Sequence, residues 1–382
     1  MGLLQKLDQE IAARALHLQQ AGESGTKIIG VSGLGYVPDE LVHAAGAIPL
    51  RLVRGGDPEP LAAASAYMDR ILCPFSRAQI GYRMLDEEPR YQMIDCFACA
   101  ITCQHMRRVA DAFEFYTDLD VFRLGVPHAP DTEPALQYYL EMARRFRAWL
   151  ETVTGTKITD EKLAASVELY NRMRSLLAEI SALRSEAHPL ISGKEFISIM
   201  HASFYLDPAD MVKLLEEMLP ELKARRDLPE QKGPRMLLTG NMLAVGDYKV
   251  VDIIEDLGGR IVMEQFCGGV RHYRSMVEPN GDIMESIARR YLGGKEPCGF
   301  MRPARSRLDL VAQLAKEYAA DGIVWYQLRY CDTYNMEFFY FNTMMKELGI
   351  PVLKLESEYD VEERGTLLNR IESFVESLEG RI

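Results

Sequence analysis

The chain has 382 residues and a formal net charge of −12. That length is enough for two domains, each with a core of its own. The negative charge argues against nucleic acid as the main partner, because phosphate binding requires a basic surface. No apolar run approaches the roughly 18 residues of a membrane span, and the N-terminus lacks the apolar stretch of a signal peptide. We therefore expect a cytoplasmic protein with no nucleic-acid or membrane partner.

The first third of the chain predicts an α/β layer. An amphipathic helix begins the chain, and a second helix is expected at residues 39–46. Strands are expected at residues 27–31, 47–53, 92–95 and 120–125. Strands and helices that alternate with short connections are typical of a parallel sheet.

The middle of the chain changes to helical periodicity. Apolar residues at spacings of three and four predict helices at 134–154, 159–186 and 207–225. The polar segment 227–234, rich in Pro and Gly, is the best candidate for a linker.

The last third returns to alternating strands and helices. Strands are expected at residues 235–240, 258–263, 321–327 and 350–355, and helices at 248–257, 309–319 and 335–348. We therefore expect an α/β protein with two doubly wound domains of the flavodoxin or Rossmann type. The expected domains cover residues 1–130 and 232–382, with a helical segment at 131–228 between them.

Seven cysteines carry most of the functional information. Their positions are Cys73, Cys96, Cys99, Cys103, Cys267, Cys298 and Cys331. An odd number in a chain without a secretory signal argues against a disulfide framework. Several follow expected strands, so their thiolates could meet at the ligand-binding edge of the sheets. This layout predicts a thiolate-bound metal site and favours an iron–sulfur cluster.

Two other interpretations of the cysteines remain open from spacing alone. Free cysteines are often small buried apolar residues. Alternatively, Cys96, Cys99, Cys103 and His105 would provide a tetrahedral zinc site, as in a zinc-stabilised binding module without enzymatic activity. The sequence contains no phosphate-binding loop of the Gly-x-x-x-x-Gly-Lys-Ser/Thr type, so any ATP would be hydrolysed by another protein.

Several segments together resemble the 2-hydroxyacyl-CoA dehydratase/benzoyl-CoA reductase family. They are residues 35–50 (GYVPDELVHAAGAIPL), 72–77 (LCPFSR), 102–108 (TCQHMRR), 330–333 (YCDT) and 355–360 (LESEYD). Gln104 departs from the pattern, since Asp usually follows that cysteine. Residues 49–56 and 124–128 are more similar to benzoyl-CoA reductase subunits than to typical dehydratases.

The resemblance implies an iron–sulfur subunit that acts on an acyl-CoA thioester by single-electron chemistry. It implies a [4Fe-4S] cluster on Cys73, Cys103 and Cys331, with one iron left open. It also implies a homologous sister subunit, or a second copy of the chain, and a separate ATPase activator with its own cluster. A benzoyl-CoA-type reductase is the first expectation, and a 2-hydroxyacyl-CoA dehydratase is the alternative.

A subgroup of the family holds a double-cubane [8Fe-9S] cluster and reduces small molecules. Cys267 and Cys298 resemble two of its further ligands, but Phe300 stands where the next cysteine is expected. Cys96 or Cys99 could take the place of that missing cysteine, or neither could. His43, His105 and Glu264 are weaker candidates for acid–base residues.

Overall fold

Two parallel sheets of four strands form the framework of the molecule. A computed structural model describes residues 3–33, 35–86, 88–225, 233–278, 281–294 and 297–380. The first sheet contains β1 (Ile28–Ser32), β2 (Ile48–Leu52), β3 (Cys96–Ile101) and β4 (Asp120–Gly125), in the order β2-β1-β3-β4. The second contains β5 (Arg235–Gly240), β6 (Arg260–Gln265), β7 (Gly322–Leu328) and β8 (Val352–Ser357), in the order β6-β5-β7-β8.

The two halves thus repeat one strand order, which is that of a doubly wound fold. Every strand pair is parallel. All residues of β1, β5 and β7 are buried, as expected for strands covered on both faces of a parallel sheet. The predicted α/β class with two doubly wound units is confirmed.

Helices cover the sheets and join them. The first half contains α1 (Leu3–Glu23), α2 (Asp39–Ala44), α3 (Pro58–Ala64), α4 (Pro74–Leu85), α5 (Pro89–Gln92) and α6 (Gln104–Tyr116). The middle contains α7 (Glu133–Thr154), α8 (Asp160–Ala182), α9 (Gly193–Ala202) and α10 (Pro208–Ala224). The last part contains α11 (Lys249–Asp256), α12 (Val270–Tyr273), α13 (Ile283–Gly293), α14 (Arg305–Glu317), α15 (Asp332–Glu347) and α16 (Glu363–Glu379).

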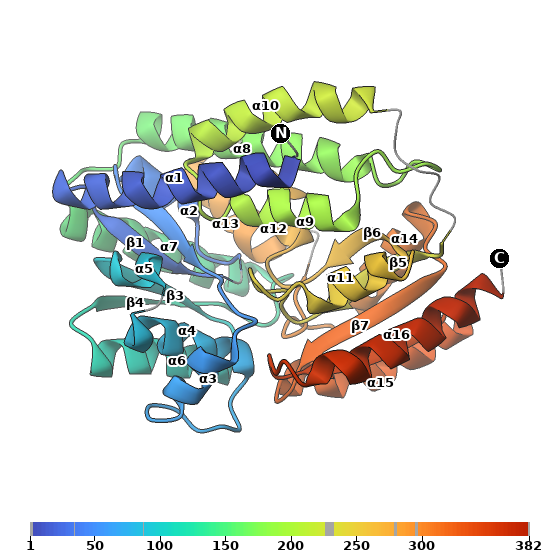
Figure 1. The fold of residues 1–382 in the computed structure, drawn as a ribbon. Coiled ribbons are helices and arrows are strands. Elements are labelled where there is room, and N and C mark those ends of the chain that lie inside the picture. Colours follow the sequence, from blue (N-terminus) through green and yellow to red (C-terminus); the bar gives the residue numbers. More distant parts are fainter. Residues whose placement is uncertain are drawn as a thin grey trace.

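The middle helices begin where their sequences supply N-terminal caps. Thr132 and Thr159 accept hydrogen bonds from the first turns of α7 and α8, and Ser192 forms a capping box with Glu195 at α9. In Figure 1, α8, α9, α10 and α1 form a layer along the top of both sheets. Helix α8 packs against α2 in one half and α12 in the other. The linker predicted at 227–234 lies, up to residue 232, outside the described residues.

One predicted strand is wrong. Residues 92–95 do not form a strand, because α5 ends at Gln92 and β3 begins at Cys96. The Asp95 side chain accepts a hydrogen bond from the Ile28 amide. Asp95 therefore lies just before Cys96, the first residue of β3 that pairs with β1. The true strand, CFACAI, is an apolar run that pairs with both β1 and β4. Its Cys and Ala content concealed it, since neither residue has a strong preference for strands.

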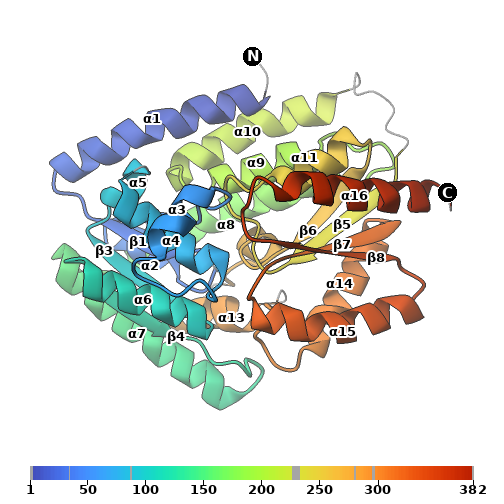
Figure 2. The ribbon, with the colours of Figure 1, turned by 60° about the horizontal axis from the view of Figure 1, so that its bottom comes forward.

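The two halves are in direct backbone contact. The Val245 amide donates to the Val53 carbonyl, and the Gly55 amide donates to the Val245 carbonyl. Gly56 has φ +95°, and a Cβ there would lie 2.8 Å from the carbonyl carbon of Gly246. Only glycine permits so close an approach in this conformation. Figure 2 shows the sheets side by side, with α6 and α15 on their respective halves.

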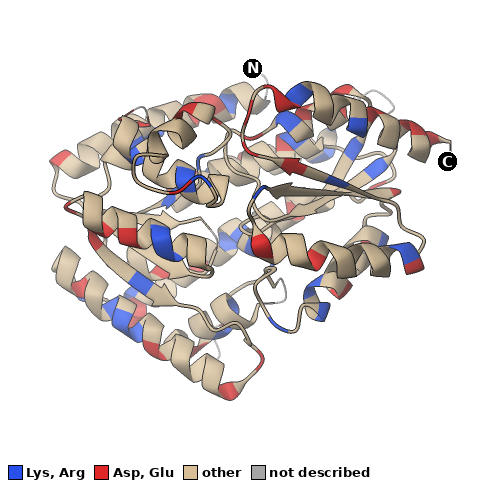
Figure 3. Ribbon diagram, turned by 90° about the horizontal axis from the view of Figure 1, so that it is seen from below, with Lys and Arg blue, Asp and Glu red and all other residues tan. Residues whose placement is uncertain are grey.

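The surface charge is mixed. In the view of Figure 3, acidic and basic positions are interspersed over the outer helices. Within the described residues, no helix combines the length and apolar character that crossing a membrane requires.

Candidate functional site

A cavity of about 380 Å³ lies where the two halves meet. Its walls include residues that directly follow strands of both sheets: Thr102 to Arg107 after β3, Asn241 and Met242 after β5, Cys267 after β6, and Cys331 to Tyr334 after β7. Ligands of doubly wound folds bind at the carboxyl ends of the strands. The cavity therefore occupies the position that the fold favours for a ligand.

Three of the cysteines that line this cavity stand at the beginning of three different helices. Cys73, Cys103 and Cys331 are the N-cap residues of α4, α6 and α15. Cys103 follows β3 and Cys331 follows β7, which are equivalent strands in the two sheets. The repeated strand order thus delivers one cysteine from each half to the same place.

The backbone around these thiols favours negative charge. Burial raises the pKa of Cys73 to about 11, while the amides of Ser76 and Phe75 in the first turn of α4 act in the opposite direction. Burial also raises the pKa of Cys103 and that of Cys331, and first-turn amides again oppose it. Helix N-termini stabilise anions through such amides. Three N-termini aimed at one cavity therefore suit an anionic group bound by three thiolates.

The three thiols are also close enough to influence one another. The charge of Cys103 raises the pKa of Cys73, and the charges of Cys73 and Cys103 raise that of Cys331. Among the described residues, no three His, Cys, Asp or Glu side chains surround a position for a single metal ion. Three thiolates around a cavity could instead each bind a different iron of an iron–sulfur cluster. The residues present fit that group.

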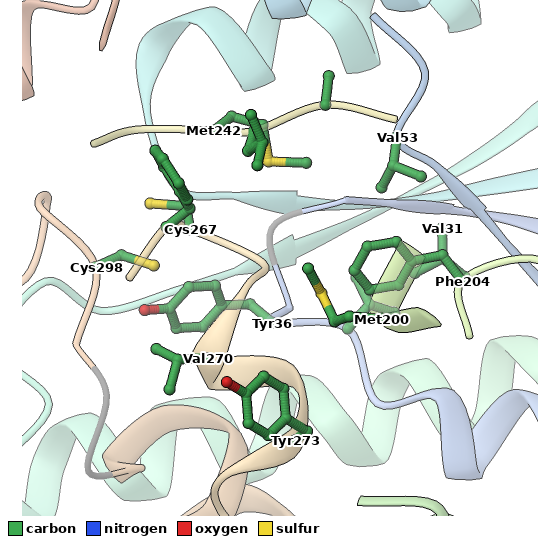
Figure 4. Close-up of a cluster of buried hydrophobic side chains, with 14 of the residues drawn as sticks. Val31, Tyr36, Val53, Met200, Phe204, Met242, Cys267, Val270, Tyr273 and Cys298 are labelled. Carbon is green, nitrogen blue, oxygen red and sulfur yellow. The ribbon is translucent and has the colours of Figure 1, made fainter. Parts of the chain in front are cut away.

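Cys267 and Cys298 lie next to each other beside the cavity. Cys267 lines the cavity, and its Sγ is 3.0 Å from the hydroxyl of Tyr334. The two side chains, which Figure 4 shows, are close enough for each to shift the pKa of the other. Phe300 stands where a further cysteine would be needed, and its ring packs against the rings of Tyr36 and His128.

Cys96 and Cys99 are not among the residues that line the cavity. Both lie within β3, where Cys99 is fully buried. Cys96 begins the strand instead of following it, so it lies at the end opposite Cys103. The five steps from Cys96 to Ile101 span roughly 16 Å in a strand. The predicted zinc set of Cys96, Cys99, Cys103 and His105 is therefore wrong, because zinc binds thiolates at about 2.3 Å.

His105 both holds the backbone at Cys73 and lines the cavity. It lines the cavity, and its Nδ1 accepts a hydrogen bond of 2.7 Å from the Cys73 amide. Burial lowers the pKa of His105. A neutral ring with Nδ1 as acceptor carries its proton on Nε2. His105 can therefore donate a hydrogen bond from Nε2 into the cavity.

The other two acid–base candidates take part in contacts outside the cavity lining. His43 Nδ1 is 3.0 Å from the hydroxyl of Ser166. Glu264 is fully buried, forms an ion pair with Arg184 and accepts a hydrogen bond from Tyr273. Neither residue is among those that line the cavity.

Sequence reasoning missed several cavity residues from the second half. Asn241, Met242 and Tyr334 line the cavity but carry no motif of their own. Tyr334 lies three residues after Cys331, so the first turn of a helix beginning there places both on the cavity side. Arg107 and Arg302 are exposed parts of the lining, one from each half. They add two positive charges to the lining, against one negative charge from the exposed Asp332.

Comparison with known proteins identifies the family of the chain. The family model for the 2-hydroxyglutaryl-CoA dehydratase D-component matches residues 35–378. The chain belongs to this family.

Three relatives show the breadth of the family. "Putative dehydratase subunit YjiM" of Escherichia coli (strain K12) is 27% identical over 93% of this chain and 92% of its own length. The (R)-phenyllactyl-CoA dehydratase beta subunit of Clostridium sporogenes is 24% identical over 95% of this chain and 94% of its own. A benzoyl-CoA reductase subunit of Thauera aromatica is 23% identical over 78% of this chain and 77% of its own. These relatives are components of enzymes, which supports an enzymatic role for this chain.

Proposed function

We propose that this chain is the iron–sulfur subunit of a 2-hydroxyacyl-CoA dehydratase, with a [4Fe-4S] cluster on Cys73, Cys103 and Cys331. The observation that carries the proposal is the convergence of three helix N-caps, all cysteine, on one cavity between the two halves. A cluster held by three protein thiolates supplies one-electron chemistry and an iron with a free coordination position.

The residues of the chain itself have three roles in this proposal. The N-termini of α4, α6 and α15 stabilise the negative charge of the thiolate-bound group. Phe75, Met242 and Phe300 provide apolar walls that exclude water from the acyl group. His105 holds a proton on Nε2 beside the bound molecule.

The charge at the cavity mouth is consistent with a CoA thioester. Exposed Arg107 and Arg302 come from different halves of the molecule and can contact phosphate groups of a ligand whose acyl end reaches the cavity. Their separation along the chain means that only the assembled fold presents them together.

The comparisons favour the dehydratase over the reductase. The matching family model is a dehydratase component, and a dehydratase subunit aligns over 95% of this chain. A benzoyl-CoA-type reductase is the second candidate, since one subunit of such an enzyme aligns over 78% of the chain. Both candidates require electrons of very low potential. Because this sequence contains no nucleotide-binding loop, we assign the ATPase activator to a separate protein.

We also propose that the chain works with a homologous sister subunit, because its relatives are named as single subunits of larger enzymes. The proposed assembly therefore comprises this chain, the sister subunit and the activator.

Iron and sulfide analysis of protein purified without oxygen tests the cluster. About four irons with matching sulfide are expected in the wild type, and Cys73→Ser, Cys103→Ser and Cys331→Ser should each lose most of both. Cys96→Ser is the matched control, because Cys96 does not line the cavity, and it should keep the full content. About eight irons would favour the double cubane, and zinc without sulfide would refute every iron–sulfur interpretation.

The reaction is tested with the sister subunit, the activator and ATP present. Loss of water from a 2-hydroxyacyl-CoA supports the dehydratase, whereas reduction of an aromatic acyl-CoA supports the second candidate. Turnover of neither substrate by a fully loaded assembly would refute both.

A further inference from the structure

Helix α15 exposes a stripe of large apolar side chains. Met336, Phe339 and Tyr340 have exposed fractions of 71%, 72% and 72%. Phe339 and Tyr340 follow Met336 by three and four residues, so the three side chains lie on one side of the helix. Among the described residues, no other helix exposes more than two large apolar side chains. In Figure 2, α15 lies at the lower right, on the outside of the second half.

The opposite side of α15 already holds the helix in the fold. Phe341 and Met345 are fully buried there, and the ring centre of Phe341 lies 4.6 Å from that of Trp325 in β7. The core of the second half therefore does not require the exposed stripe. Single exposed apolar residues are normal, whereas a contiguous group of them is typical of an interaction surface.

The stripe follows the spacing of helices that pack side by side. Asp332, Met336, Phe339, Thr343 and Lys346 succeed one another at alternating intervals of four and three residues, and all five are exposed. These intervals are those of the contact positions in a pair of packed helices. The stripe begins with an acid, has apolar residues in its middle and ends with a base. We call these five residues the α15 stripe.

The charges make the α15 stripe complementary to a copy of itself. Asp332 and Lys346 lie seven residues before and seven residues after Phe339. When two α15 helices pack antiparallel with Phe339 at the centre, each Asp332 faces Lys346 of the second copy. Within the described residues, α15 forms its ion pair through the buried Glu337 and not through these two charges. Both end charges are therefore available to a second molecule.

We propose that two copies of this chain pair through the α15 stripe, antiparallel and about a two-fold axis beside Phe339. A parallel pair would place the two Asp332 carboxylates side by side, and like charges at that distance repel. Glu347 follows Lys346 but lies about 100° further round the helix, so Lys346 is the residue that meets Asp332 of the second copy.

The size of the stripe determines how strongly the copies bind. Its large apolar side chains together expose roughly 400 Å². With the charged ends included, two copies bury roughly 1,000 Å² in total, which is the lower limit for a specific interface. We therefore expect a dissociation constant of about 1–100 µM.

The pairing also reaches the cavity between the two halves. Cys331 and Asp332 stand at the beginning of α15, and both line that cavity. In the antiparallel pair, Lys346 of the second copy therefore adds a positive charge at the cavity rim. This inference goes beyond the proposed function and does not depend on it, because it needs only the surface of α15.

Analytical ultracentrifugation of the full chain, purified without oxygen, tests the pairing. Between about 1 and 200 µM, the average mass should rise from that of one copy, 43.3 kDa, towards that of two. Phe339→Glu should raise the dissociation constant at least about tenfold, because it places two carboxylates at the centre of the interface. Phe115→Glu is the matched control, since Phe115 is 80% exposed on α6, and it should pair like the wild type. Thermal unfolding checks that both variants are folded.

Reversal of the end charges tests the antiparallel arrangement. Asp332→Lys and Lys346→Asp should each raise the dissociation constant at least about threefold, because each leaves like charges facing at both ends. An equimolar mixture of the two variants should recover the wild-type value, since every facing pair is again of opposite sign.

Three results would overturn the proposal. The first is a wild type that remains a single copy at 200 µM, and loss of sister-subunit binding by Phe339→Glu would then assign the stripe to that subunit. The second is self-association that Phe339→Glu leaves unchanged. The third is a mixture of the charge variants that pairs no better than either variant alone. Iron content is measured on the same samples, and a dimer without iron would refute the proposed function alone.

Discussion

Substitutions of His105 test directly how the backbone at Cys73 is held in place. Its Nδ1 accepts a hydrogen bond of 2.7 Å from the amide of Cys73, a residue that is only 8% exposed. His105→Phe keeps an aromatic ring but removes the acceptor. His105→Asn places an amide oxygen near the former position of Nδ1, so it preserves the acceptor and removes the proton on Nε2.

The expected cost follows from the lost hydrogen bond. An amide left without a partner in a buried position costs about 1–3 kcal/mol, and the contact here is only partly buried. We therefore expect His105→Phe to lower the free energy of unfolding by about 1–2 kcal/mol, which corresponds to roughly a 5- to 30-fold change in the unfolding equilibrium. For His105→Asn we expect a loss below about 1 kcal/mol, because only the packing of the ring is lost.

Urea unfolding of the cluster-free chain in reductant measures these values, at an unchanged dependence on urea concentration. Iron content after reconstitution reports whether the loop of Cys73 still binds. In the assembled enzyme, His105→Asn should keep its iron while kcat falls at least about tenfold, since the proton on Nε2 is gone.

Equal destabilisation by the two variants would refute the role of the acceptor. Full activity of His105→Asn would refute the role of Nε2 as a donor without affecting the first conclusion.

Two further predictions concern the rest of the fold. Burial lowers the pKa of His201 from 6.5 to about 3, so the unfolded chain binds the proton first and the free energy of unfolding falls as the pH drops below 6.5. Between about pH 7.5 and 5.5 this loss of stability amounts to about 1.4 kcal/mol. In urea unfolding, His201→Asn should remove this pH dependence, whereas His17→Asn, at an exposed position, should leave it in place. Gly56→Ala places a Cβ 2.8 Å from the Gly246 backbone, whereas Gly258→Ala, at a similar positive φ, meets nothing within 4 Å. In thermal unfolding, Gly258→Ala should lower the free energy of unfolding by about 1–2 kcal/mol, and Gly56→Ala by at least about 1 kcal/mol more. Equal losses for the two variants would contradict the close approach of the two halves at Gly56.

The sequence predicted most of the fold because its signals are local. The apolar runs of β4 and β5 match their predicted bounds of 120–125 and 235–240, and those of β1, β2, β7 and β8 match within two residues. Helices with clear caps, such as α7 and α8, were also found. Local signals failed for β3, where Cys and Ala replace the usual β-branched residues, and for α9, a short helix between two loops.

The candidate site was only partly predictable. Motif resemblance selected Cys73, Cys103 and Cys331, and the structure places all three on one cavity. The spacing of Cys96 and Cys99 also suggested that they belong to the site. A sequence motif does not reveal that Cys96 and Cys103 lie at opposite ends of the strand β3.

By itself, the sequence determined the α/β class, the repeated rhythm of strands and helices and the family, since these depend on periodicity and on short motifs. Only the tertiary structure decided which cysteines meet. The shared strand order brings the ends of β3 and β7 to one cavity, and packing of residues far apart in sequence brings Cys267 close to Cys298 and His105 to Cys73. The physical reason is that burial, hydrogen bonding and charge at a site depend on neighbours in space, which the chain acquires only when both halves are packed together.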